Sequence, residues 1–178
     1  MSRTVCNSLM VVTLAALLGG CGLTQSVSEA TTSTAKSIFY TEVKTLHLDF
    51  SGRASVNMHE SKMTALSVPT MVRVYQLRSE KAVERADYDK LVSNDEDVLA
   101  GDLLDKRALV VRPEQGAQLN VPLHEDARFV AVVALFRQPE DKADKWRLTL
   151  SRDDLDPDQP RFVELGNNQL NLRPLVKD

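Results

Sequence analysis

Apolar and polar residues alternate with a period of two along several short stretches of the chain. In V-K-T-L-H-L-D-F, residues 43–50, Leu46, Leu48 and Phe50 alternate with polar neighbours. Successive side chains of a strand point to opposite faces, so this pattern predicts a half-buried β-strand. Further strands are predicted at residues 68–77, 108–112, 117–123, 128–137, 145–150, 161–165 and 168–175. Short strands separated by turn residues predict a mainly β fold, a two-sheet β-sandwich.

The pattern changes between residues 79 and 104. S-E-K-A-V-E-R-A-D-Y-D-K-L, residues 79–91, contains good helix formers and a loose apolar face, and Ser79 is a candidate N-cap. V-L-A-G-D-L-L, residues 98–104, is expected to add another helical turn. The sequence therefore predicts a small helical insert at about residues 79–104.

Residues 129–136 are apolar at every position. In an antiparallel sandwich, one face of each sheet usually meets water and is polar, so a continuously apolar strand indicates burial on both faces. We expect the helical insert at 79–104 to pack outside this sheet and provide the second cover.

The first residues have the features of a secretory signal peptide. Arg3 is basic, and the apolar stretch from Leu9 to Leu18 is too short to span a bilayer as a helix. The site Leu18-Gly19-Gly20-Cys21 resembles the bacterial lipobox, which predicts a lipoprotein signal peptide at 1–20 and acylation (palmitate among the chains) of Cys21. An ordinary signal peptide with an incidental cysteine is the alternative. By resemblance to sorted lipoproteins, Gly22 in place of Asp indicates the periplasmic face of the outer membrane.

Residues 24–37 are rich in Ser, Thr and Ala and have no strand or helix period. Residues 21–37 are therefore predicted to be the lipidated cysteine and a flexible tether, with a root-mean-square span of about 20 Å over its fourteen residues. A segment folded back on the domain is the alternative. The β-sandwich domain is expected at residues 38–178.

Charge and cysteine content limit which partners and which cross-links the domain is expected to have. The formal net charge is −3, and loss of Arg3 with the signal peptide makes it −4, which argues against a nucleic-acid partner. Cys6 leaves with the signal peptide and Cys21 is acylated, so the domain is expected to have no disulfide.

Candidate chemistry is sparse. The histidines, His47, His59 and His124, have no metal-ligand spacing, and neither a G-x-S-x-G motif nor a glycine-rich phosphate loop occurs. The acidic run at 153–158 lacks the glycine and terminal glutamate of a calcium loop, which favours a solvated turn. The sequence therefore predicts a protein that is not an enzyme and has no metal or cofactor. Carboxylates brought together by folding remain an alternative.

The stretch from Ser51 to Ser67 is long for a connection between neighbouring strands. It contains Met58, Met63 and Leu66 among polar residues, and methionine adapts well to contact surfaces. This loop is a candidate binding surface, although the same side chains could instead pack into the rim of the core.

Several motifs, in order after the lipobox, resemble one family. They are V-R-V-Y-Q-L at 72–77, V-E-R-A-D-Y-D-K-L at 83–91, L-A-G-D-L-L at 99–104, V-R-P-E at 111–114, F-V-A-V-V-A-L-F-R at 129–137 and K-W-R at 145–147. From about residue 43 onward, the chain resembles the type VI secretion system outer-membrane lipoproteins, the TssJ family.

The resemblance implies a transthyretin-like two-sheet sandwich with extra helices and a protein without enzymatic activity. It also implies a lipid-anchored adaptor in assembly of the membrane complex, docking on the periplasmic C-terminal domain of an IcmF-like inner-membrane protein. The family's docking loop, between the first two strands, maps to about Asn57–Val68. The implied contact residues are Asn57, Met58, His59, Glu60, Ser61, Lys62, Met63, Thr64 and Leu66.

The chain departs from the family pattern at some positions. Asn57 fits the loop motif but the following residues do not, Val83 replaces a common aromatic residue, and Glu114 replaces a common glycine. Two other functions stay open from the sequence. One is a periplasmic lipoprotein that binds a small ligand between its sheets. The other is a lipid-anchored hydrolase, which would need a cleft that brings His47 or His124 to carboxylates.

Overall fold

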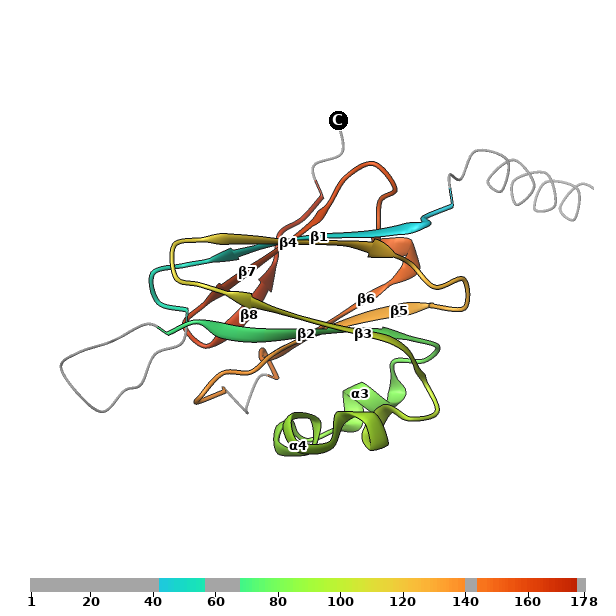
Figure 1. Ribbon diagram of the computed structural model, residues 1–178, viewed down its shortest axis with the longest axis horizontal. Helices are drawn as coiled ribbons and strands as arrows, with labels where there is room; N and C mark the ends of the chain where they lie inside the picture. Colours follow the sequence, from blue (N-terminus) through green and yellow to red (C-terminus); the bar gives the residue numbers. More distant parts are fainter. Residues whose placement is uncertain (1–41, 57–67, 140–143, 176–178) are drawn as a thin grey trace, which may run out of the picture. The chain divides into compact units, whose positions relative to one another are not determined.

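The computed structural model describes residues 42–56, 68–139 and 144–175. In this part, two four-stranded sheets lie face to face (Figure 1). The strands are β1 (Thr45–Gly52), β2 (Thr70–Leu77), β3 (Leu103–Val111), β4 (Gly116–Pro122), β5 (Phe129–Ala134), β6 (Arg147–Ser151), β7 (Arg161–Gly166) and β8 (Gln169–Leu172). The helices are α3 (Lys81–Arg85) and α4 (Tyr88–Leu99), with a 3-10 turn, η2, at Arg152–Asp154.

The two sheets have the strand orders β4-β1-β7-β8 and β3-β2-β5-β6. Neighbouring strands are antiparallel except for β1 and β7, which are parallel, with Phe50 opposite Val163. β4 and β8 are the edges of the first sheet, and β3 and β6 are the edges of the second. The chain passes between the sheets after β1, β3, β4 and β6, so both sheets contain strands that are distant in sequence.

The predicted alternation in β1 is confirmed. Leu46, Leu48 and Phe50 are at most 2% exposed and face the second sheet, whereas the residues between them are more exposed. From the second sheet, Val72 and Val74 are buried to a similar degree. Burial of one such side chain stabilises the fold by roughly 1.5–3 kcal/mol, so apolar packing between the sheets is the main source of stability.

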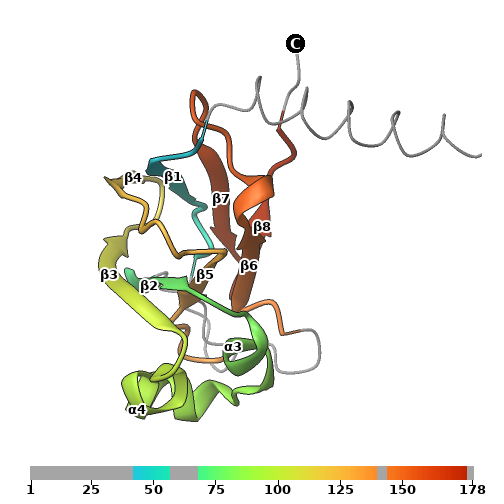
Figure 2. The ribbon, with the colours of Figure 1, turned by 90° about the vertical axis from the view of Figure 1, so that its right-hand side faces the viewer.

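Helices α3 and α4 cover the outer face of the β3-β2-β5-β6 sheet (Figure 2). On this face, Tyr75 donates a hydrogen bond to Asp95 of α4 at 2.7 Å, and Arg73 donates one to the carbonyl of Leu91 at 2.9 Å. Residues 130–134 of β5 are all buried, because alternate side chains face the core and the helical layer. The prediction of a strand covered on both sides by the helical insert is therefore confirmed.

The boundaries of the insert differ from the prediction. Glu80 is the N-cap of α3, although the Ser79 hydroxyl still accepts a hydrogen bond from the Lys81 amide at 3.3 Å. The last helix ends at Leu99 and is kinked at Asn94, and Leu103 and Leu104 belong to β3. The predicted turn over 98–104 is therefore wrong in its second half. Leu103 pairs with Leu77 of β2. The backbone groups of this segment are therefore paired within the sheet and not within a helical turn.

Strand β3 is also longer than the predicted 108–112. Its first half is charged, which gave no strand signal, but β3 is an edge strand and edges tolerate charged side chains. Lys106 contacts Asp95 at 2.8 Å, and Arg107 contacts Asp105 at 2.9 Å.

Candidate functional site

The direction of β1 defines two ends of the described domain. The N-terminal segment enters at Glu42, before β1 begins at Thr45, and the predicted docking loop follows the other end of the strand. Eight strand residues at about 3.3 Å each separate these points by roughly 26 Å. In Figure 1 the start of β1 and its end therefore lie at opposite ends of the sandwich. We call them the tether end and the loop end.

The side chains that the sequence named as functional lie outside the described residues. These are Cys21 and the docking residues Asn57, Met58, His59, Glu60, Ser61, Lys62, Met63, Thr64 and Leu66. What the structure describes is the stem from which the loop projects. The stem runs from Gly52 to Val56 on one side and from Val68 to Thr70 on the other, and Val56 and Thr70 are at most 1% exposed.

The turn between β3 and β4 holds one side of the stem. The Gly52 amide donates to the carbonyl of Gln115 at 3.0 Å, and the Glu114 amide donates to the carbonyl of Gly52 at 2.9 Å. A Cβ atom at residue 52 would lie 2.3 Å from the carbonyl oxygen of Arg112, so only glycine fits there. Glu114, the residue that replaces a common glycine, has φ 57° and adopts the left-handed conformation that glycine favours. The left-handed backbone at residue 114 is the physical reason why glycine is common at this position in the family.

The end of β7 and the turn between β7 and β8 hold the same side of the stem, a few residues further along. The Arg53 amide donates to Leu165 at 2.8 Å, and the Asn167 amide donates to Ser55 at 2.7 Å. The Ser55 hydroxyl also donates to the Asn167 side-chain oxygen at 2.8 Å. Asn167 and Asn168 both have positive φ, as a two-residue type I′ hairpin requires. The loop therefore begins from a stem fixed by two neighbouring turns.

Charged groups brace the same end. Glu164 accepts contacts from Arg53 at 2.6 Å and from Arg173 at 2.9 Å, one on each carboxylate oxygen. The hydrogen bond from Arg173 and the nearby Arg53 hold the pKa of Glu164 below its ordinary value, against an opposing effect of burial. Glu164 is thus ionised at neutral pH, and its role is to fix the stem.

At the tether end, Arg152 connects the start of the domain to the segment between β4 and β5. Its guanidinium donates to the carbonyl of Val43 at 2.8 Å and to that of Ala127 at 2.9 Å, and it contacts Glu42 at 3.5 Å. The same group donates to the carbonyls of His124 and Glu125. Sequence reasoning missed this residue, because its partners are distant in the chain. Arg152 fixes the point at which the N-terminal segment leaves the sandwich.

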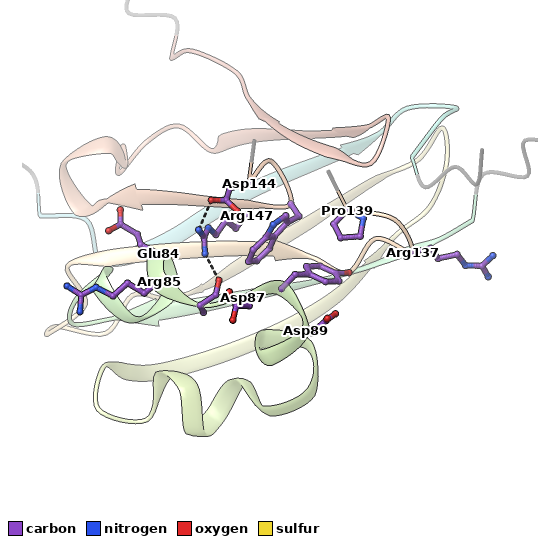
Figure 3. A pocket seen from close by; sticks show the side chains of 11 residues that line it. Glu84, Arg85, Asp87, Asp89, Arg137, Pro139, Asp144 and Arg147 are labelled. Carbon is purple, nitrogen blue, oxygen red and sulfur yellow. Dashed lines mark hydrogen bonds and ion pairs between the residues drawn. The ribbon is translucent and has the colours of Figure 1, made fainter. Parts of the chain in front are cut away.

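A surface hollow of about 610 Å³ lies beside the helical layer (Figure 3). Arg147 forms part of its wall, contacts Asp144 at 2.8 Å and donates to the carbonyls of Val83 and Ala86. Its guanidinium also lies 4.7 Å from the centre of the Trp146 ring. Trp146 is only 2% exposed, so its ring is not open for a ligand to stack on. These contacts attach α3 to the sheet.

The histidines do not form a catalytic or metal centre in the described part. His47 Nδ1 lies 2.8 Å from Asn120 Oδ1, and His124 Nδ1 accepts the amide of Asp126 at 3.1 Å. His59 lies outside the described residues. Across residues 42–56, 68–139 and 144–175, no group of three or more His, Cys, Asp or Glu residues could hold a metal ion.

The acidic run at 153–158 forms local turns. The Asp154 carboxylate accepts hydrogen bonds from the Ser151 amide at 2.8 Å and from its hydroxyl at 2.6 Å. These hydrogen bonds lower the pKa of Asp154. Asp156 accepts the amides of residues 158 and 159, as aspartate does in turns. The run therefore has a structural role.

Helices long and apolar enough to cross a membrane are not found in the part of the chain that the structure describes. The sequence left open a small ligand bound between the two sheets, and the packing there shows how much of that space side chains fill. The space there holds large buried side chains such as Leu46, Leu48, Leu150 and Leu165, and the hollow in Figure 3 lies beside the helices instead.

Comparisons with known proteins agree on one family. Residues 44–168 match the family model T6SS-SciN, described as type VI secretion lipoprotein, VasD, EvfM, TssJ. A search of the curated proteins gives no match.

Among solved structures, a chain of a "Type VI membrane complex" is 36% identical, with a TM-score of 0.69, over 74% of this chain and 99% of that chain. A chain in "T6SS protein TssM C-terminal domain (869-1107) from EAEC" is 32% identical, with a TM-score of 0.66, over 75% of this chain and 100% of that one. Serratia marcescens Lip, described as a membrane bound component of the type VI secretion system, is 23% identical, with a TM-score of 0.65, over 75% of this chain and 99% of that chain, and supports the fold.

Proposed function

The chain belongs to the family of type VI secretion lipoproteins, and on this premise we propose that it is a lipid-anchored adaptor of the secretion membrane complex. Acyl chains on Cys21 hold it to the periplasmic face of the outer membrane, and the loop at about 57–68 docks on the periplasmic C-terminal domain of a TssM-like, IcmF-type inner-membrane protein. The family consists of secretion lipoproteins and not of enzymes, which confirms the prediction that the protein has no catalytic role.

The observation that carries this proposal is the separation of the two ends of the domain. Arg152 fixes the point where the N-terminal segment enters, and the stem of the loop is fixed at the other end of β1. A protein that joins a membrane to a partner needs its anchor and its docking surface on different ends, so that neither blocks the other. The sandwich between them is a rigid spacer.

A similarity to a solved structure supports the partner. One solved structure is named for the TssM C-terminal domain. A chain in that structure aligns over its full length with three quarters of our protein. The aligned chain is therefore shorter than the TssM domain, which spans residues 869–1107 of TssM, so the aligned chain is not the TssM domain itself. A chain 32% identical to ours thus occurs together with a TssM domain, which supports a TssM-like partner for this protein.

The outer membrane is supported by the sequence after the acylated cysteine. Two or more acyl chains give stable membrane anchoring, at roughly 0.8 kcal/mol per buried methylene. Gly22 lacks the aspartate that favours retention at the inner membrane. Both partners are then confined to the periplasm, where tethering raises the effective concentration of one for the other.

A binding titration tests the docking role. The acylated full-length protein in detergent micelles would be titrated with the purified periplasmic C-terminal domain of the TssM-like protein from the same genome. Saturable binding is expected, with loss of affinity of at least tenfold when residues 57–67 are replaced by a short Gly-Ser turn, because the loop supplies the contacts.

The control replaces exposed residues at the tether end, Asp158 and Gln159, by serine, which should leave the affinity unchanged. If the loop replacement folds and binds as tightly as the wild type, the assignment of the loop is wrong. If the wild-type protein does not bind the domain, the proposed partner is wrong.

A further inference from the structure

Within the described residues, the helical layer does not cover one corner of its sheet. On the outer face of β2, Arg73 and Tyr75 contact α4. Met71 lies two residues nearer the loop end on the same face and is 44% exposed. Directly opposite, on the edge strand β3, Val110 is 49% exposed. We call Met71 and Val110 the β2–β3 corner.

The β2–β3 corner adjoins the stem of the docking loop. Met71 is the second residue of β2, and the preceding Thr70 is part of the stem. Thr70 pairs with Val111 in the same register that places Met71 opposite Val110. On the other side of Met71, its carbonyl accepts the amide of Leu135 at 2.8 Å, so the backbone of the corner is held by strand pairing from both neighbours.

The two side chains form a single apolar surface. Large apolar side chains that are exposed in the described residues include Met71, Val110 and Phe162. Directly opposed residues on antiparallel strands have Cβ atoms about 4.5–5.5 Å apart, so Met71 and Val110 are in reach of each other. Phe162, on β7 of the other sheet, stands apart from them.

The size of the corner limits what can cover it. Two half-exposed side chains present less than about 200 Å², whereas a standard interface buries about 800 Å² on each partner. The corner alone is therefore too small to hold two copies of this chain together. It can be one part of a larger interface, because the stem beside it leads into the loop that we propose docks on the partner domain.

We propose that Met71 and Val110 form an apolar part of the docking surface, continuous with the stem of the 57–68 loop, and contact an apolar surface of the TssM-like periplasmic domain. This inference rests on the proposed function and extends it from a loop to the adjoining sheet. The strands fix the backbone of both residues before binding, so binding there requires no ordering of the main chain. A charge placed where an interface excludes water weakens binding, so lysine substitutions at the corner report on its burial in the complex.

The test uses the acylated full-length protein and the same partner domain. The double variant Met71→Lys with Val110→Lys introduces two charges at the corner and is expected to raise the dissociation constant by at least tenfold. A milder variant, Met71→Gln with Val110→Thr, keeps the shape of both side chains and guards against misfolding. It is expected to weaken binding about threefold to tenfold with an unchanged melting temperature. Phe162→Lys is the matched control, because Phe162 is equally exposed on the other sheet, and it should bind like the wild type.

The outcomes separate this inference from the proposed function. If both corner variants fold and bind as the wild type does, while the Gly-Ser loop replacement does not bind, the inference is overturned and the docking loop stands. If the wild type itself does not bind, both fail. Sedimentation of the wild type without the partner provides a further check. A dimer that the corner variants dissociate would assign the corner to a second copy and overturn the proposed occupant.

Discussion

At the residue scale, Asp95 is a buried charged side chain that links the helical layer to the sheet. It is 6% exposed and lies on α4 against the outer face of the sheet. Its carboxylate accepts the Tyr75 hydroxyl at 2.7 Å and contacts Lys106 at 2.8 Å and Arg73 at 3.3 Å. Burial by itself raises the pKa of Asp95, but the hydrogen bonds from Lys106 and Tyr75 and the charge of Arg73 hold it below its ordinary value. Burial, with the bond to Asp95, also raises the pKa of Tyr75.

We expect Asp95→Asn to lower the free energy of unfolding by about 1–3 kcal/mol at neutral pH, because Lys106 and Arg73 lose their buried carboxylate partner. A carboxylate whose folded pKa is lowered stabilises the fold above its unfolded pKa of about 3.9, and this contribution is lost as the pH falls through the lower folded pKa. The difference between variant and wild type should therefore shrink below about pH 4. Urea unfolding at several pH values measures it.

The control for Asp95→Asn is Asp89→Asn, an exposed aspartate on the same helix. Its free energy of unfolding should stay within about 0.5 kcal/mol of the wild type. If Asp95→Asn is equally mild at neutral pH, the carboxylate does not hold the layer in the way its contacts indicate.

At the scale of the element, the helical layer is attached to the sheet by arginine side chains as well as by apolar contacts. Arg73 of β2 donates to the carbonyls of Leu91 and Val92 in α4. Arg147 of β6 donates to the carbonyls of Val83 at 2.7 Å and Ala86 at 2.8 Å, at the end of α3. A guanidinium reaches two carbonyls at once, which a lysine ammonium does with less fixed geometry. A helix as short as α3 depends on such contacts, because it is unstable by itself.

Arg147→Lys is expected to loosen α3 and the start of α4 without unfolding the sandwich. Backbone amides at 81–92 should exchange with deuterium faster than in the wild type, while those of β2 and β5 keep their protection. The loss of overall stability should be about 1–2 kcal/mol. Hydrogen exchange read by mass spectrometry measures both regions in one experiment.

Arg85→Lys supplies the comparison, since Arg85 lines the same hollow but is exposed. Its exchange pattern should match the wild type. Uniformly faster exchange over the whole domain in Arg147→Lys would show that the helical layer and the sandwich unfold as one unit, which contradicts this view of α3.

At the scale of the whole molecule, the anchor and the folded domain are expected to be independent. Residues from Glu42 to Asp178 form one compact unit, and its hydrophobic core is made within that unit. Removal of the acyl chains should therefore release the protein without weakening the fold. The docking surface that we propose is at the loop end of this unit, so release should also leave affinity for the partner domain intact.

Cys21→Ser tests this independence. With residues 1–20 replaced by an ordinary cleavable signal peptide, the variant is expected to leave the membrane fraction and become soluble in the periplasm, because the predicted acylation requires the thiol. Its melting temperature and its affinity for the partner domain in solution should equal those of the wild type. Fractionation, thermal unfolding and titration give the three readings. A variant that stays with the membrane would contradict anchoring through Cys21, and a lower melting temperature would show that the N-terminal segment contributes to the fold.

The sequence by itself determined which stretches become strands wherever one face is buried. Alternation in residues 43–50 marked β1, and the unbroken apolar run at 129–136 indicated the second cover over β5. These signals are local, because a strand's side-chain period appears within a few residues. The first half of β3 gave no such signal, since an edge strand can carry charges, and leucines at 103 and 104 resembled the end of a helix.

Only the tertiary structure decided which distant segments meet. Contacts between residues about 60 to 110 positions apart join the fold. They are the parallel pairing of β1 with β7, the two turns that hold the stem at Gly52 and Ser55, and the contact of Arg152 with Val43. The exposed pair Met71 and Val110 is likewise visible only in the register of β2 with β3, because each residue alone is an ordinary apolar position of a strand. Hydrophobic pattern is a property of neighbours in the chain. Pairing and uncovered surface depend instead on how the sheets and helices pack, and that packing holds the start and the end of β1 at opposite ends of the sandwich.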